Sequence, residues 1–158
     1  MKWPPLFGLL LTIVLLFAAM TMGGPFLIFI NVSSMILVPC VTALLLVCMH
    51  GWTDVSTYIV GGYRRIFMVT DGIPWGEKQC RKAVRLANSG GSLCLMAGGL
   101  AVMVGVITVA QNLDDPTAIG PSAALALLSA LYTFLLNLLL FVPLSRHYAE
   151  QVLERVEA

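Results

Sequence analysis

Charged residues are scarce in this sequence and are absent from three long stretches. Asp, Glu, Lys and Arg make up 11% of the 158 residues, whereas 59% are apolar and the mean hydropathy is +0.92. None of the four charged types occurs in residues 3–53, 86–113 or 116–145. A soluble domain of this size spreads charge over its surface. The sequence therefore predicts an integral membrane protein.

Paired cysteine motifs are also missing. Cys40, Cys48 and Cys94 lie in the apolar stretches, and Cys80 lies in the charged middle of the chain. Their spacing matches neither a metal site nor a disulfide framework. We expect neither in this protein.

Catalytic groupings are missing as well. His50 and His147 lie at the edges of the apolar stretches without a nearby Ser or Cys nucleophile arrangement, and the glycines do not form a phosphate-binding loop. The net charge of +1 gives no indication of nucleic-acid binding. We expect no enzymatic activity, no cofactor and no nucleic-acid partner.

The apolar stretches are long enough for four transmembrane helices. Gly23, Gly24 and Pro25 divide the first stretch, since glycine permits a tight turn and proline suits the start of a helix. About twenty apolar residues cross a bilayer as a helix. The predicted spans are residues 6–22, 26–49, 89–111 and 120–142. The predicted fold is all-α, an integral membrane four-helix protein with a first hairpin (1–49), a short cytoplasmic helical segment (50–88), a second hairpin (89–144) and a cytoplasmic tail (145–158).

The basic residues indicate the orientation in the membrane. All nine fall on one side of the four spans, and the opposite side carries only Asp114 and Asp115. By the positive-inside rule, both termini and the central segment are cytoplasmic. The nine residues are Lys2, Arg64, Arg65, Lys78, Arg81, Lys82, Arg85, Arg146 and Arg155.

The cytoplasmic segment is too short to form an independent core. Its sequence indicates a helical stretch near residues 55–70, a break at 71–74 and a basic helical stretch at 77–87. We expect helical extensions of the second and third spans, joined by a turn. The tail is a candidate amphipathic helix, with Val152 on one face and Glu150 on another.

The fourth span carries a stripe of small and polar residues. The stripe consists of Ser122, Ala126, Ser129, Thr133 and Asn137. Steps of three or four residues place them near one helix face over about 22 Å. Because lipid offers no hydrogen bonds, we expect this face to meet something other than lipid.

The third span carries a seam of small residues, which would let another helix backbone approach closely. The seam consists of Gly91, Cys94, Gly98, Ala101, Gly105 and Thr108. Packing against a helix of the same chain is the common explanation. Contact with a helix of a partner chain is the alternative.

No Asp, Glu, Lys, Arg or His lies inside the four predicted spans. A transporter or a proton relay usually has a titratable group there. If this chain serves proton flow, the acid must come from a partner helix. Hydroxyls such as those of Ser129 and Thr133 would then line the path.

Two regions resemble a known family. Residues 112–121 (NLDDPTAIGP), followed by 126–132 (ALLSALY) and 140–143 (LFVP), resemble the MotA/TolQ/ExbB proton-channel family, and most of all its flagellar-stator MotA branch. Gly23-Gly24 and residues 29–38 (FINVSSMILV) are similar to that branch's entry into the second span.

The resemblance implies a multi-pass subunit of the bacterial inner membrane that forms a ring, typically a pentamer, around a MotB/ExbD/TolR-like single-span partner. That partner supplies a membrane Asp, and proton passage there drives mechanical work on the cell envelope. Ser129 matches a channel-lining hydroxyl of the family, Tyr132 its aromatic neighbour and Pro143 the proline at the cytoplasmic end. Gly98 and Gly105 match third-span glycines.

The candidate residues fall into three groups. The channel-lining candidates are Ser129, Thr133, Asn137, Thr108 and Val102. The helix-packing candidates are Gly91, Gly98, Ala101 and Gly105. The gating or structural candidates are Tyr132 and Pro143.

Several positions depart from the family pattern. Val102 stands where the family has a third-span threonine, Ala130 where it has a second fourth-span hydroxyl, and Leu95 where it has a proline. The large cytoplasmic domain of the flagellar stators is reduced to residues 50–88. These departures keep a second hypothesis open, a non-conducting membrane scaffold of the same architecture. A small-solute channel formed by this chain alone is a third, and the uncharged spans make it the weakest.

Overall fold

A computed structural model of the chain describes residues 4–22, 29–67 and 76–156, and every regular element in these ranges is helical. The prediction of an all-α fold is confirmed. In chain order the helices are α1 (Pro4–Met22), α2 (Val32–His50), α3 (Trp52–Val55), η2 (Ser56–Val60), α4 (Gly61–Phe67), α5 (Glu77–Gln111), α6 (Pro116–Leu136), η3 (Asn137–Phe141) and α7 (Val142–Val156). The elements η2 and η3 are π-helical turns.

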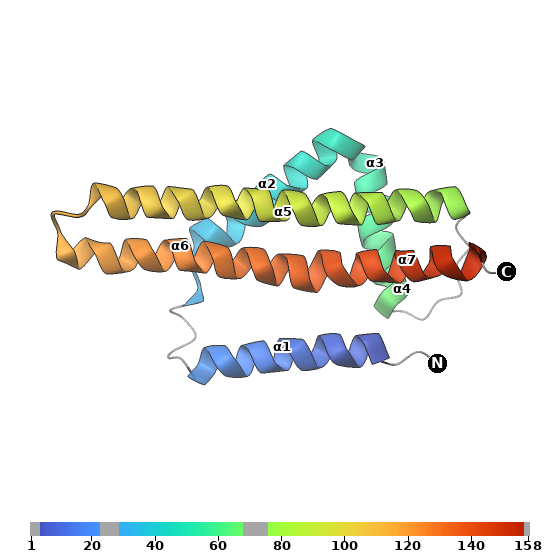
Figure 1. The fold of residues 1–158 in the computed structure, drawn as a ribbon, viewed down its shortest axis with the longest axis horizontal. Helices are drawn as coiled ribbons and strands as arrows, with labels where there is room; N and C mark the ends of the chain where they lie inside the picture. The colour runs from blue at the N-terminus through green and yellow to red at the C-terminus, as the bar shows by residue number, and fades with distance from the viewer. Residues whose placement is uncertain (1–3, 23–28, 68–75, 157–158) are drawn as a thin grey trace.

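The second hairpin dominates the molecule. Helix α5 runs antiparallel to one long helix made of α6, η3 and α7 (Figure 1). Helix α5 has 35 residues, which corresponds to about 52 Å and exceeds the roughly 30 Å of a bilayer core. Its first part, from Glu77, is the expected extension of the third span. The described part of the tail is helical, as expected; it continues the fourth predicted span as α7 and packs along α5.

The hairpin turn is defined by a helix cap. Asp115 precedes α6, and its Oδ1 accepts hydrogen bonds from the backbone amide of Thr117, at 3.0 Å, and from the Thr117 hydroxyl, at 2.7 Å. These bonds hold the pKa of Asp115 below its ordinary value. The charged carboxylate therefore caps the start of α6, and Pro116 occupies a position where its missing amide costs nothing.

Two of the described helices are long and apolar enough to cross a membrane, Lys78–Gln111 and Thr117–Leu153. A third span is present if the bent pair Ser34–His50 and Trp52–Arg64 counts as one. The apolar helix Leu10–Met22 is shorter than the required length. The chain is thus a membrane protein, and the four-span count stays a prediction.

Helix α2 begins later than the predicted second span. Residues 26–28 and the turn at Gly23-Gly24-Pro25 lie outside the described residues, but the structure places 29–31 before the helix. Asn31 is extended, and its side chain accepts a hydrogen bond from the Ser34 amide. The predicted start at residue 26 was wrong because this cap defines the beginning of the helix at Val32.

A helical extension of the second span was expected, but the helix after α2 does not continue in the same direction. The chain turns by 118° between α2 and the following helix. Gly51 makes this turn, with φ +82° and ψ +152°, a conformation that is almost confined to glycine. The predicted break at 71–74 lies outside the described residues.

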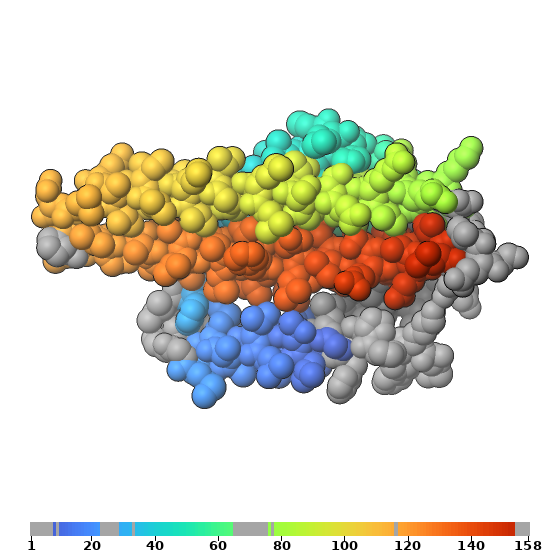
Figure 2. Space-filling model, viewed as in Figure 1, coloured from blue at the N-terminus to red at the C-terminus, as the bar shows by residue number. Residues whose placement is uncertain are grey.

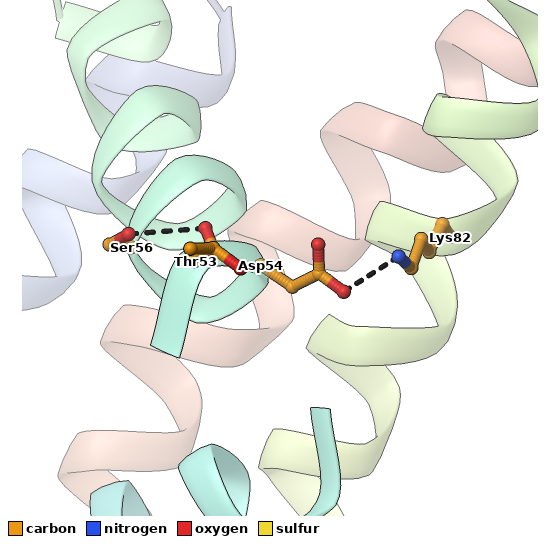
Figure 3. A network of polar contacts seen from close by, with 4 residues as sticks. All are labelled: Thr53, Asp54, Ser56 and Lys82. Atoms are coloured by element: carbon orange, nitrogen blue, oxygen red, sulfur yellow. Dashed lines mark hydrogen bonds and ion pairs between the residues drawn. The ribbon is translucent and has the colours of Figure 1, made fainter. Parts of the chain in front are cut away.

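Residues 52–67, comprising α3, η2 and α4, form what we call the cross-helix. It runs across the hairpin rather than along it (Figure 1). One ion pair joins it to α5, between Lys82 Nζ and Asp54 Oδ2 at 2.6 Å, and Ser56 Oγ donates to the Thr53 carbonyl beside it (Figure 3). The Lys82 side chain is half exposed, so this pair contributes little to stability.

The buried core lies where α2, the cross-helix, α5 and α7 meet. Its members include Val38, Leu46, Tyr58, Ala83, Leu86, Leu144 and Tyr148. Helix α1 contributes no buried side chain among those described, and it lies beyond the α6–α7 edge of the hairpin in the view of Figure 2. Its apolar side chains therefore remain available to lipid or to another chain.

Candidate functional site in the membrane hairpin

The small-residue seam of α5 faces the polar stripe of α6 within the same chain. A Cβ atom built on Gly91 would lie 3.0 Å from Asn137 Oδ1, and one built on Gly105 would lie 2.7 Å from the Ala126 Cα atom. A Cβ atom on Gly98 would overlap the Thr133 side chain. The two patterns seen in the sequence are thus the two sides of one interface.

Only small residues allow the two helices to approach this closely. Cys94 and Ala101 are buried in the same seam, and Cys94 Sγ lies 3.7 Å from the Thr133 carbonyl oxygen. Close approach of backbones is the main source of helix association in lipid, where no hydrophobic force draws helices together. The seam therefore holds the second hairpin closed.

Four buried hydroxyls line this part of the hairpin and the neighbouring α2. Ser129 and Thr133 are 2% and 4% exposed, and Ser34 and Thr42 of α2 are buried to the same degree. Ser34 Oγ and Ser129 Oγ lie 2.9 Å apart and share a hydrogen bond. Thr133 Oγ1 donates to the Ser129 carbonyl at 2.7 Å. The structure brings Ser34, Ser129 and Thr133 together in one polar cluster.

Ser34 and Thr42 of α2 were not among the predicted site residues, although the sequence contains a pattern that indicates them. Ser34, Val38 and Thr42 are spaced by four residues, which puts them on one helix face, and all three are buried. A stripe of this kind on the second span matches the polar stripe on the fourth. Only the structure pairs Ser34 with Ser129, however, because the two residues are 95 positions apart.

Tyr132 joins the start of α2 to the hairpin. Its hydroxyl donates to the Phe29 carbonyl and accepts a hydrogen bond from the Asn31 amide at 3.2 Å. It therefore satisfies two backbone groups next to the cap that begins α2. This contact gives Tyr132 a structural role in the described fold.

The other channel-lining candidates are placed less centrally. Thr108 is partly buried, and its hydroxyl donates to the Val104 carbonyl of its own helix at 2.9 Å. Val102 is also partly buried and offers no polar atom. Asn137 begins the π-helical turn η3 and faces Gly91. The described hydrogen bonds do not connect these residues to the Ser34–Ser129 pair.

The chemistry of the polar cluster is limited to hydrogen bonding. Each hydroxyl can donate one proton and accept others, but none can carry charge near neutral pH. A charge in transit through this region would need a carboxylate or a similar group from elsewhere. Among the described residues, the four buried polar side chains are all hydroxyls. Their channel-lining role stays a prediction.

Comparison with known proteins gives partial matches. No family model matches the chain. It is 38% identical over 55 residues to the chemotaxis protein PomA of Vibrio alginolyticus, which covers 35% of this chain and 22% of PomA. It is 29% identical over 107 residues to the uncharacterized protein YtxD of Bacillus subtilis, which covers 68% of this chain and 36% of YtxD.

These matches are partial and indicate a relationship rather than a particular role. The chain spans between about one fifth and just over one third of the length of the curated relatives it matches. Over the shared third of the chain, the PomA match supports a relationship to MotA-like proteins. The resemblance seen in the fourth-span motif points to the same class of protein.

Proposed function

We propose that this chain is a ring-forming subunit of an ion-driven motor in the bacterial inner membrane, of the MotA type. The observation that carries the proposal is the 38% identity to PomA, which agrees with the motif in residues 112–143. In this proposal, copies of the chain form a ring, a pentamer by analogy with the family. The ring surrounds a MotB/ExbD/TolR-like single-span helix that supplies an Asp, and proton passage at that Asp is converted into mechanical work on the cell envelope.

The fold supports this proposal in two ways. The polar cluster of Ser34, Ser129 and Thr133 contains hydroxyls but no acid, so a proton path here would require an acid from a partner. The apolar side chains of α1 and of the outer face of α5 are exposed, which leaves surface for contacts between copies. Both termini and the cross-helix are cytoplasmic in this arrangement.

Copurification tests the proposal directly. The tagged chain, expressed in a bacterial membrane with an Asp-bearing single-span candidate from a neighbouring gene, should elute as a ring that contains that protein. Replacing the Asp of the partner by Asn should leave the ring intact and abolish ion flux. A stable monomer that never retains such a partner would contradict the proposed function.

One observation favours the alternative, a non-conducting membrane scaffold. The hydroxyls of Ser129 and Thr133 are buried and already bonded within the subunit, and Val102 contributes no hydroxyl at all. Proton flux should be measured in liposomes that contain the chain and its partner, for the native protein and for Ser129→Ala and Val102→Thr. Flux that falls in Ser129→Ala supports the motor. An absence of flux in all three proteins supports the scaffold.

A further inference from the structure

Pro143 interrupts the backbone hydrogen bonds of the fourth-span helix without ending it. In an α-helix the carbonyl of residue 139 accepts a bond from the amide of residue 143, and Pro143 has no amide hydrogen. One residue earlier the helix is in π register, since the Val142 amide bonds to the Asn137 carbonyl, five positions back. The carbonyls of Leu138 and Leu139 therefore lack their ordinary α-helical donors.

Tyr63 provides a donor at this turn from a distant part of the chain. Its hydroxyl, on α4 of the cross-helix, lies 2.9 Å from the Leu139 carbonyl oxygen and 2.6 Å from that of Leu140. The Tyr63 ring also lines an apolar cavity of about 370 Å³ between α2, the cross-helix and η3. In such surroundings an unpaired carbonyl is costly. The hydroxyl is thus within hydrogen-bond reach of the Leu139 carbonyl, which Pro143 leaves without its ordinary donor, and it also contacts the neighbouring Leu140 carbonyl.

A second tyrosine fixes the cross-helix about two helical turns beyond η3 on the same long helix. The Tyr148 hydroxyl of α7 donates to the Tyr58 carbonyl, inside the π-helical turn η2, at 2.6 Å. Gly62 allows this close approach, because a Cβ atom there would overlap the Tyr148 hydroxyl and lie 2.5 Å from Leu144 Cδ1. The cross-helix is therefore attached to the hairpin by two hydroxyl-to-carbonyl bonds, each directed at a π-helical turn.

We propose that Tyr63 is a positioning residue whose hydroxyl replaces the backbone donor removed by Pro143. It thereby fastens the cross-helix to η3, a turn of the final span whose backbone bonding is not α-helical. Bending of the final span at this turn then moves the cross-helix with it. The contact itself stands independently of the proposed motor function, and the transmission of movement rests on that function.

A double-mutant cycle tests the contact in the full chain. Thermal unfolding in detergent should be compared for the native protein, Tyr63→Phe, Pro143→Ala and the double variant. Tyr63→Phe should lower the Tm by about 2–6 °C. In the Pro143→Ala background, Tyr63→Phe should lower the Tm by less than half as much, because the backbone amide at position 143 can then bond to the Leu139 carbonyl.

Tyr148→Phe is the matched control. It removes the same kind of bond from the same cross-helix, but its acceptor, the Tyr58 carbonyl, does not depend on Pro143. Its loss of Tm should be equal in the two backgrounds. An equal loss for Tyr63→Phe in both backgrounds, or no loss in the native one, would overturn the assignment.

The functional consequence has a separate readout. With the partner present, the Tyr63→Phe variant should still copurify as a ring. The mechanical work that this ring delivers for each ion transported should fall. Unchanged output from an assembled Tyr63→Phe ring would overturn the transmission role. If the double-mutant cycle shows coupling but the chain binds no partner, the Tyr63 contact is upheld and the proposed function is refuted.

Discussion

At the scale of single residues, the buried hydroxyls determine how the membrane helices are aligned. The Ser34–Ser129 bond joins α2 to α6 at one height, and the Thr133 hydroxyl is bonded within its own helix. Hydrogen bonds between membrane helices contribute on average about 0.6 kcal/mol. A single bond of this strength adds little stability. It favours one alignment of the helices, because sliding would break the bond between the two hydroxyls, although Ser129 would keep its bond to the Leu125 carbonyl of its own helix.

Gly98 provides the sharpest residue-scale prediction. Gly98→Leu should destabilise the hairpin by about 1–3 kcal/mol, because the new side chain would occupy the space of the Thr133 side chain. Thermal unfolding in detergent measures the change. Gly99→Leu is the matched control, since no atom lies within 4 Å of a Cβ atom built on Gly99. Equal effects of the two substitutions would show that the seam does not hold α5 and α6 together.

At the scale of elements, the bend after α2 determines where the cross-helix lies. The cross-helix reaches the hairpin only because the chain turns by 118° at this point. A straight continuation would have carried Tyr63 away from η3. Just after the bend, the ion pair between Asp54 and Lys82 joins the start of the cross-helix to α5 (Figure 3).

Gly51→Ala tests this bend. The φ of +82° with ψ +152° is strained for any residue with a side chain, at a cost of about 1–3 kcal/mol. No atom lies within 4 Å of a Cβ atom at this position, so the loss would come from backbone strain alone. In Gly51→Ala, the Tm is expected to fall and the bond between the Tyr63 hydroxyl and η3 is expected to weaken. Gly76→Ala, at φ −61° and with equally open surroundings, should change the Tm little, and a similar fall there would contradict this explanation.

At the scale of the whole molecule, much apolar surface is left uncovered. On α5 the exposed side chains include Met96, Leu100, Met103 and Ile107, which share one helix face at steps of three and four residues. Their position opposite the seam means that α5 meets its own chain on one side and lipid or another chain on the other. This division of faces is what a subunit of a membrane assembly requires.

The orientation in the membrane gives the prediction at this scale. Cysteine introduced at Asp114, in the turn between α5 and α6, should react with a membrane-impermeant maleimide in intact spheroplasts, because the positive-inside rule predicts that the acidic turn is on the outer side. Cysteine introduced at Lys78, an exposed residue near the other end of α5, should react only after the membrane is opened. The native chain provides the background labelling. Labelling of the Lys78 variant in intact spheroplasts would reverse the orientation.

Local patterns were enough to identify the two long membrane helices of the second hairpin and their packing faces. The apolar stretches, the small-residue seam of α5 and the stripe of α6 are periodic features, and helical geometry turns them into faces without further information. The capped start of α2 at Asn31 was missed because apolar residues continue on both sides of it. The Gly51 turn was missed because a lone glycine near a span end does not specify a direction.

The sequence by itself determined that this is an all-helical membrane protein with a small-residue seam and a polar stripe on its last two long helices, since hydropathy and helical period depend only on neighbours in the chain. Only the tertiary structure decided which faces meet. The Ser34–Ser129 bond, the joining of Tyr132 to the start of α2 and the contact of Tyr63 with η3 all connect residues at least 76 positions apart. The first two depend on where α2 crosses the hairpin, and the third depends on the bend at Gly51. No local pattern encodes either.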